Sequence, residues 1–197
     1  MGAIKAYVRV VEAFNRRVGR FAMYLLFAMM AVLLWSSVSK TFFVPALWTL
    51  EMAQFAMVAF YMLGGPYSIQ LGSNVRMDLF YSEWSPRRKA WVDAFTVGFL
   101  IFYLVILLWG ALSSTAYSLG HFSSDTFGFY ATLAGALVTG GPEAAAAEFG
   151  HLERSASAWR PFLWPVKVIM CIGIFLMLLQ ALATLFKDIA AVRGEEI

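Results

Sequence analysis

The chain has 197 residues, of which 61% are hydrophobic and 14% are charged. A soluble domain has about 45–50% apolar and about 25% charged residues, so this composition excludes an ordinary soluble protein and predicts an all-α membrane protein. The net charge of +3 does not indicate nucleic-acid binding, because the basic residues cluster beside apolar segments, where they report membrane topology.

The first 20 residues form a basic arm before the first apolar segment. Its arginines fall largely on one face of a helix, and apolar residues occupy the other. The apolar positions at helical spacing are Ile4, Tyr7, Val8, Val11, Phe14 and Val18. This pattern predicts an amphipathic helix that lies on the cytoplasmic surface against membrane lipids.

Four segments are apolar and long enough to cross a bilayer, which takes about 20 helical residues. They cover about residues 21–41, 45–65, 92–117 and 164–186, inside one membrane domain of residues 21–187 that is followed by a tail, 188–197. The first segment lacks a clear cleavage site, so we expect it to remain as an anchor. Before the third, Ser85-Pro86 is typical of a helix start.

Most lysines and arginines that flank these segments lie on one side of the predicted membrane. That side holds both termini and the loop between the second and third segments. The positive-inside rule therefore predicts that both termini are cytoplasmic and that the loop of residues 121–160 is outside.

The outer loop contains a second apolar stretch, residues 127–138, of about 12 residues. This length is below that of a span and closer to a re-entrant or interfacial piece. A fifth span is the alternative, but it would move Lys187 and Arg193 to the outside, against the charge rule.

The sequence predicts no enzyme and no cofactor. It has no phosphate-binding loop, no metal-ligand spacing and no nucleophile motif, and both histidines, His121 and His151, lie in the outer loop. Two other polar groups have structural interpretations. Lys167 can reach the headgroups from the last span, and Gln180 can bond to a neighbouring helix.

Glu51 is the main candidate for a functional group, because carboxylates in membrane segments are costly. It lies near the start of the second span, one helical turn before Gln54. There the positive end of the helix dipole favours an anion, so we interpret it as structural. A coupling-ion site stays open as the alternative.

Several short motifs occur along the four segments, and their order is more specific than any one of them alone. A Trp-x-x-Glu at the start of the second span precedes "VRMD" and "SPRRKAW". The matching positions are Trp48, Glu51, Gly64, Arg76, Asp78, Pro86 and Arg88. Over about residues 15–125 and 158–190 the chain resembles the small membrane (Q) subunit of tripartite ATP-independent periplasmic (TRAP) transporters, in a subgroup with a longer outer loop.

The resemblance implies a scaffold role in a bacterial inner membrane. The partners it implies are a large multi-span membrane subunit, which holds the substrate and sodium sites, and a periplasmic solute-binding protein, which delivers an organic acid or similar solute. It implies no substrate site in this chain. The candidates for partner-interface or structural positions are Trp48, Glu51, Gln54, Arg76, Asp78 and Trp91.

Two other functions compete with this interpretation. The chain could be a stand-alone small proton-coupled exporter that uses Glu51, although small multidrug exporters are much shorter and carry their glutamate in the first span. It could also be a membrane assembly or sensory protein. The sequence does not identify the transported solute.

Overall fold

The computed structural model describes residues 2–72 and 84–193, and every regular element in these ranges is helical except for one isolated β-bridge. The helices are α1 (Gly2–Phe42), α2 (Thr49–Leu71), α4 (Pro86–Ser118), α5 (Thr126–Ala147) and α6 (Trp164–Arg193). The all-α prediction is therefore confirmed for the described part. Two predicted site residues, Arg76 and Asp78, lie outside it.

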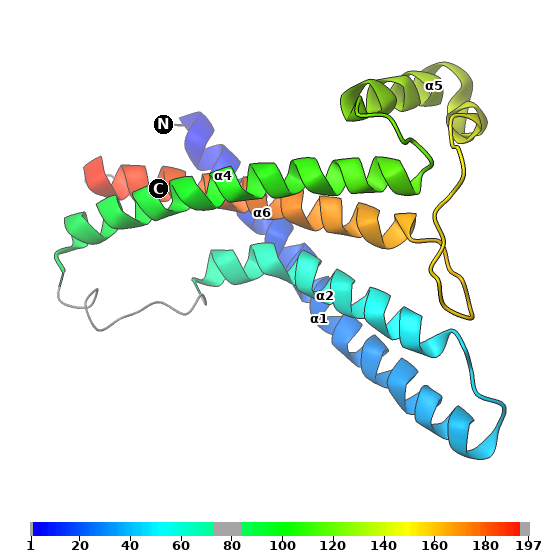
Figure 1. Ribbon diagram of the computed structural model, residues 1–197. Helices are drawn as coiled ribbons and strands as arrows, with labels where there is room; N and C mark the ends of the chain where they lie inside the picture. The colour runs from blue at the N-terminus through cyan, green and yellow to red at the C-terminus, as the bar shows by residue number, and fades with distance from the viewer. Residues whose placement is uncertain (1, 73–83, 194–197) are drawn as a thin grey trace.

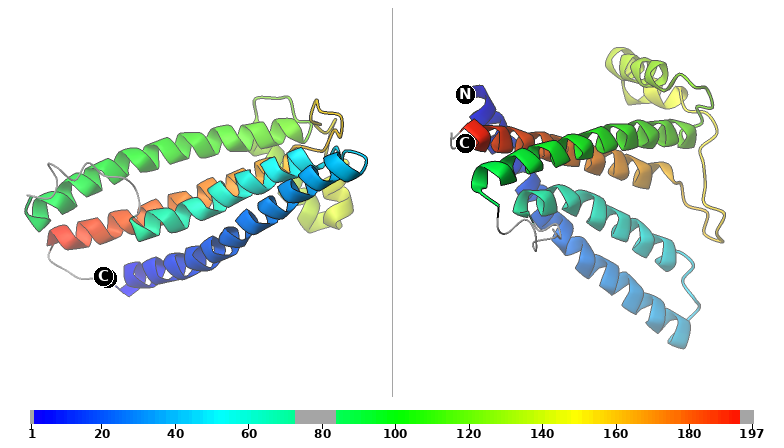
Figure 2. Two further views of the ribbon diagram at one scale, coloured as in Figure 1. Left: turned by 90° about the horizontal axis from the view of Figure 1, so that it is seen from below. Right: turned by 60° about the vertical axis from the view of Figure 1, so that its left-hand side comes forward.

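The four long helices form two pairs, α1 with α2 and α4 with α6, and the pairs meet where α2 and the first half of α1 contact α6 (Figure 1). Both chain termini lie at one end of the bundle, called here the terminal end (Figures 1 and 2). Helix α5 and the connection from α5 to α6 lie at the opposite end, called here the loop end. The two pairs diverge toward the loop end.

Three helices in the described ranges are long and apolar enough to cross a membrane: α1, the Arg88–Ser118 part of α4, and α6. Helix α2 has 23 residues, or a length of about 34 Å, which would suffice by length alone. It is not among the three, because Glu51, Gln54 and the Gly64-Gly65-Pro66 run reduce its hydropathy. The count of four spans is thus not confirmed.

The N-terminal arm is the first half of α1, which continues without a break from Gly2 to Phe42. The predicted amphipathic arm is therefore continuous with the first predicted span, through Gly19, and its position on the cytoplasmic surface stays a prediction. The arm also packs against protein: Val8 and Val11 form a buried cluster with Ala183 of α6. Phe14, which we expected on the same face, is 52% exposed.

Helix α5 occupies part of the predicted outer loop. Asp125 caps its first turn by accepting a hydrogen bond from the Gly128 backbone N–H at 2.9 Å. The helix is broken at Gly141, where φ is +75°, immediately before Pro142. It attaches to α4 through Tyr130, whose hydroxyl donates to the Leu112 carbonyl oxygen at 2.9 Å. Helix α5 is not among the helices apolar enough to span a membrane.

Glycines allow the helices to approach closely where the pairs meet. A Cβ added at Gly173 of α6 would lie 2.6 Å from the Met62 carbonyl oxygen of α2. A Cβ at Gly19 of α1 would overlap the Tyr67 side chain of α2. Small residues at helix contacts are typical of membrane bundles, where dispersion contacts replace the hydrophobic effect as the driving force.

Candidate functional site

Glu51 lies in the first turn of α2, because the helix begins at Thr49. Its side chain is buried, with 7% of the residue exposed, and its Oε1 accepts a hydrogen bond from the Ser155 hydroxyl at 2.9 Å. Its Oε2 is buried with no hydrogen-bond partner among the described residues. The N-terminus of α2 contributes a favourable positive potential at this position.

The start of α2 is also joined to α1. The Thr49 hydroxyl donates to the Ala46 carbonyl oxygen at 2.9 Å and lies 3.0 Å from the Ser36 hydroxyl. Thr49 and Ser36 are both buried. The polar groups at this helix start are therefore used to connect α1 and α2.

Ser155 belongs to a short hairpin between α5 and α6, residues 153–163, called here the loop hairpin. Its two arms are held by backbone hydrogen bonds, from Ser155 N–H to the Pro161 carbonyl and from Leu163 N–H to the Glu153 carbonyl, at 2.9 and 3.2 Å. The Arg154 guanidinium stacks over the Phe162 ring, 4.3 Å from its centroid. These contacts fix the hairpin locally and present Ser155 to Glu51.

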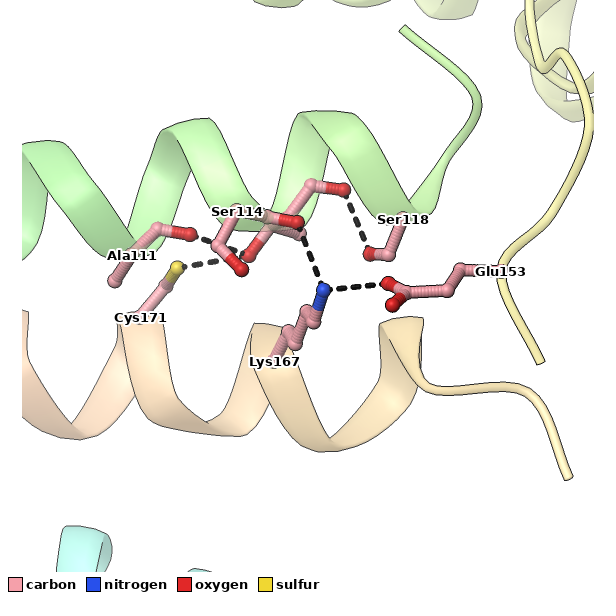
Figure 3. A network of polar contacts seen from close by, with 7 residues as sticks. Ala111, Ser114, Ser118, Glu153, Lys167 and Cys171 are labelled. Atoms are coloured by element: carbon pink, nitrogen blue, oxygen red, sulfur yellow. Dashed lines mark hydrogen bonds and ion pairs between the residues drawn. The ribbon is translucent and has the colours of Figure 1, made fainter. Parts of the chain in front are cut away.

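Lys167 connects the loop hairpin to the α4–α6 pair (Figure 3). From α6, its ammonium donates to the Glu153 carboxylate at 2.6 Å and to the Ser114 carbonyl oxygen of α4 at 3.1 Å. We expected Lys167 to extend to the headgroups, and the structure instead gives it two protein partners. One turn further along α6, the Cys171 sulfur lies 3.3 Å from the Thr115 hydroxyl.

The loop hairpin thus contacts both helix pairs where they diverge. Ser155 bonds to Glu51 of the α1–α2 pair, and Glu153 bonds to Lys167 of the α4–α6 pair. We call this set of four residues the loop junction. No group of three or more metal-ligating side chains occurs within residues 2–72 and 84–193.

The other predicted site residues do not gather around Glu51. Trp48 precedes it and is 38% exposed, and Gln54 is exposed on α2. Trp91 is 62% exposed near the start of α4, at the terminal end. Their roles as interface residues stay predictions.

Sequence reasoning missed the partners of the central polar residues. Ser155 is 104 positions from Glu51, and no local pattern indicated the contact. The expected interhelical bond of Gln180 is confirmed: its amide oxygen accepts from the Asn15 side chain at 2.8 Å, with both residues buried. A signal for Asn15 existed, since it continues the buried spacing of Val8 and Val11.

A family model for the DctQ component of tripartite ATP-independent periplasmic transporters matches residues 29–147. Comparison with curated proteins and with solved structures gave no match. The family match includes Glu51 and all of α5, whereas the predicted resemblance omitted α5 and added the last helix. Because the match covers more than half of the chain, the chain belongs to this family, which is a family of transporter components and not of enzymes.

Proposed function

We propose that this chain is the small scaffold subunit of a sodium-coupled secondary transporter in a bacterial inner membrane. Its partners are a large multi-span membrane subunit, which holds the substrate and sodium sites, and a periplasmic binding protein, which delivers an organic acid or similar solute. The family match supports the general role. Structural observations support the division of labour between the subunits.

The observation that carries the proposal is the uncovered apolar surface of two helices. In the most apolar 18-residue stretch of α1 only 11% of the residues are buried, and the share is the same in α4. In the corresponding stretch of α6, 33% are buried. Between α1 and α6, the Asn15 side-chain N–H is already paired with the Gln180 amide oxygen. Such a chain offers surface for packing against lipid and a partner, which fits a scaffold better than a transport pathway.

The test is co-purification of the tagged full chain from its native membrane in mild detergent, with bound proteins identified by mass spectrometry. We expect a large membrane protein of the same transporter class in stoichiometric amount, and no transport by vesicles that contain this chain alone. Solute uptake by vesicles that contain only this chain would overturn the proposal.

We propose further that α2 is the fourth span and that both termini are cytoplasmic. The termini lie at the same end of the bundle, together with the arginines of α1's first half. Reporter fusions after Gly120 and after Arg193 should lie on opposite sides of the membrane. Fusions on the same side would indicate that α5 crosses.

In this scheme Glu51 has a structural role, as the anchor of the loop junction. Glu51→Gln keeps a carbonyl oxygen that can accept from Ser155, so the fold should survive while the charge is lost. We expect weaker assembly with the large subunit and unchanged sodium dependence of transport. An intact complex with altered sodium dependence would contradict this role.

The buried Oε2 of Glu51 favours one second candidate, a proton-coupled exporter that uses this carboxylate. Its position in the first turn of α2, far from the middle of a span, argues against a central transport site. Proteoliposomes of the isolated chain decide between the two: proton-driven export that Glu51→Gln abolishes would support the exporter.

A further inference from the structure

We propose that the exposed face of α4 near the terminal end binds one anionic phospholipid, with the headgroup beside Arg88 and an acyl chain beside Gly98. The site does not depend on the transporter's solute, and it involves neither Glu51 nor the loop junction. Two adjoining hollows on the same helix carry the inference.

The first hollow lies at the start of α4 and has a volume of about 600 Å³. Its walls are Trp84, Ser85, Arg88, Trp91 and Val92. An arginine guanidinium donates in a fork that matches phosphate oxygens, and tryptophan is the residue most typical of the headgroup level. Arg88 also belongs to the sequence triplet Arg87-Arg88-Lys89, so the positive charge at this end complements an anionic lipid.

The second hollow follows on α4 and has a volume of about 550 Å³. It is lined by Ala94, Phe95, Gly98, Phe99 and Phe102. The Phe95 and Phe99 rings pack edge to face with centroids 4.9 Å apart, and the space beside Gly98 is open, with no atom within 4 Å of an added Cβ. The lining is apolar and suits a hydrocarbon chain.

The dimensions of the two hollows match a lipid in one leaflet. From Ala94 to Phe102 the helix rises about 12 Å, close to the roughly 15 Å depth of half the hydrocarbon layer. Residues 84, 88, 91, 95, 98 and 102 recur at steps of three and four, so both hollows lie along one face. A basic and aromatic head region therefore continues into an open apolar groove of acyl-chain length.

The experiment measures lipid retention by the full chain, purified in mild detergent with its co-purifying proteins, by native mass spectrometry. The probes are dioleoyl phosphatidylglycerol, which is anionic, and dioleoyl phosphatidylcholine, which has no net charge but the same chains. We expect at least a fivefold preference for phosphatidylglycerol. Equal retention of the two lipids would overturn the proposal.

Two variants separate the head and chain regions. Arg88→Gln should remove the preference for phosphatidylglycerol, with the control Arg160→Gln, at the loop end, unchanged. Gly98→Leu should fill the second hollow and lower retention of both lipids about fivefold. Its matched control is Gly110→Leu, because Gly110 also lies on α4 with open space around it but outside the hollows.

A photo-reactive residue at Phe95 identifies the occupant in the native membrane. Cross-linking to phospholipid supports the proposal, and cross-linking only to a protein overturns it. Thermal unfolding of each variant checks its fold, which should be retained because neither Gly98 nor Gly110 has a neighbour in the way. If Gly98→Leu retains as much lipid as Gly110→Leu does, the second hollow is not a lipid site.

Discussion

Two regions of the bundle hold the helix pairs together by different interactions: the packed contact between the pairs, and the loop end. Where the helix pairs meet, buried apolar residues and small residues bring the backbones close, and one buried amide pair, Asn15 with Gln180, joins α1 to α6. At the loop end the pairs diverge, and the loop junction connects them through an ion pair and a hydroxyl–carboxylate bond.

The difference indicates where rigidity and adjustability lie in this chain. In a closely packed contact, a change in side-chain shape lowers the free energy of unfolding steeply, since little can move to compensate. Polar ties at a partly exposed loop are weaker and depend on salt. We therefore expect substitutions in the packed part to affect the whole fold, and substitutions at the loop junction to affect mainly the loop end.

The largest effect should follow from Gly173→Leu. The added side chain meets the Met62 backbone, which cannot move without shifting α2, so we expect a loss of about 2–3 kcal/mol in unfolding free energy. Unfolding in detergent measures it. The control Gly110→Leu adds the same side chain into open space and should change stability by about 0.5 kcal/mol or less. Equal effects would mean that α2 and α6 are not in tight contact.

A smaller effect is expected for Asn15→Ala, which leaves the Gln180 amide oxygen without its buried donor. Polar bonds between membrane helices are worth about 0.6 kcal/mol on average and up to about 1.7, so we expect a loss of about 1 kcal/mol. A double-mutant cycle with Gln180→Ala isolates the pair. Strictly additive losses would show that the two side chains do not interact.

At the loop end, Ser155→Ala should leave global unfolding nearly unchanged but release the loop hairpin from Glu51. A lost hydrogen bond of about 1 kcal/mol raises local opening about fivefold, so backbone amides of residues 153–163 should exchange faster by that factor. Hydrogen exchange with mass spectrometry reads this directly. Ser37→Ala, an exposed change on α1, serves as the control, and unaltered exchange in Ser155→Ala would contradict the junction.

The smallest effect should come from Glu153→Gln, which removes the ion pair with Lys167. The Glu153 side chain is 31% exposed and that of Lys167 is 18% exposed, so solvent screens the pair. It should contribute about 0.5 kcal/mol to the free energy of unfolding at low salt. The difference from wild type should disappear at about 1 M salt, where the screening length is about 3 Å. Glu148→Gln, an exposed carboxylate before the hairpin, is the control. A loss that persists at high salt would indicate a buried pair.

Long apolar runs made α1, α4 and α6 predictable, because length and hydropathy alone indicate them. Helix α5 was harder to predict, because its glycines and Pro142 are typical of loops. The helix accommodates Pro142 through a break at Gly141. The continuity of α1 was missed because a change from basic to apolar composition was interpreted as a structural boundary.

For Glu51, the sequence predicted the position in a helix but not the hydrogen-bond partner. Its place near a helix start could be predicted from the apolar segment 45–65, and α2 begins slightly later, at Thr49. Its partner could not, because Ser155 reaches it only through the fold of the loop hairpin. Gln180 is a related case: a lone amide in an apolar helix predicted a bond to a neighbouring helix, but the sequence did not identify Asn15 as its partner.

The unbroken course of α1 has a mechanical consequence. Its 41 residues make a rod of about 60 Å, roughly twice the thickness of the hydrocarbon layer. Without a joint near residue 20, the tilt of the membrane-crossing half and the position of the arm cannot change independently. The contacts of Val8 and Val11 with α6 therefore also constrain the tilt of the half of α1 that ends at Phe42.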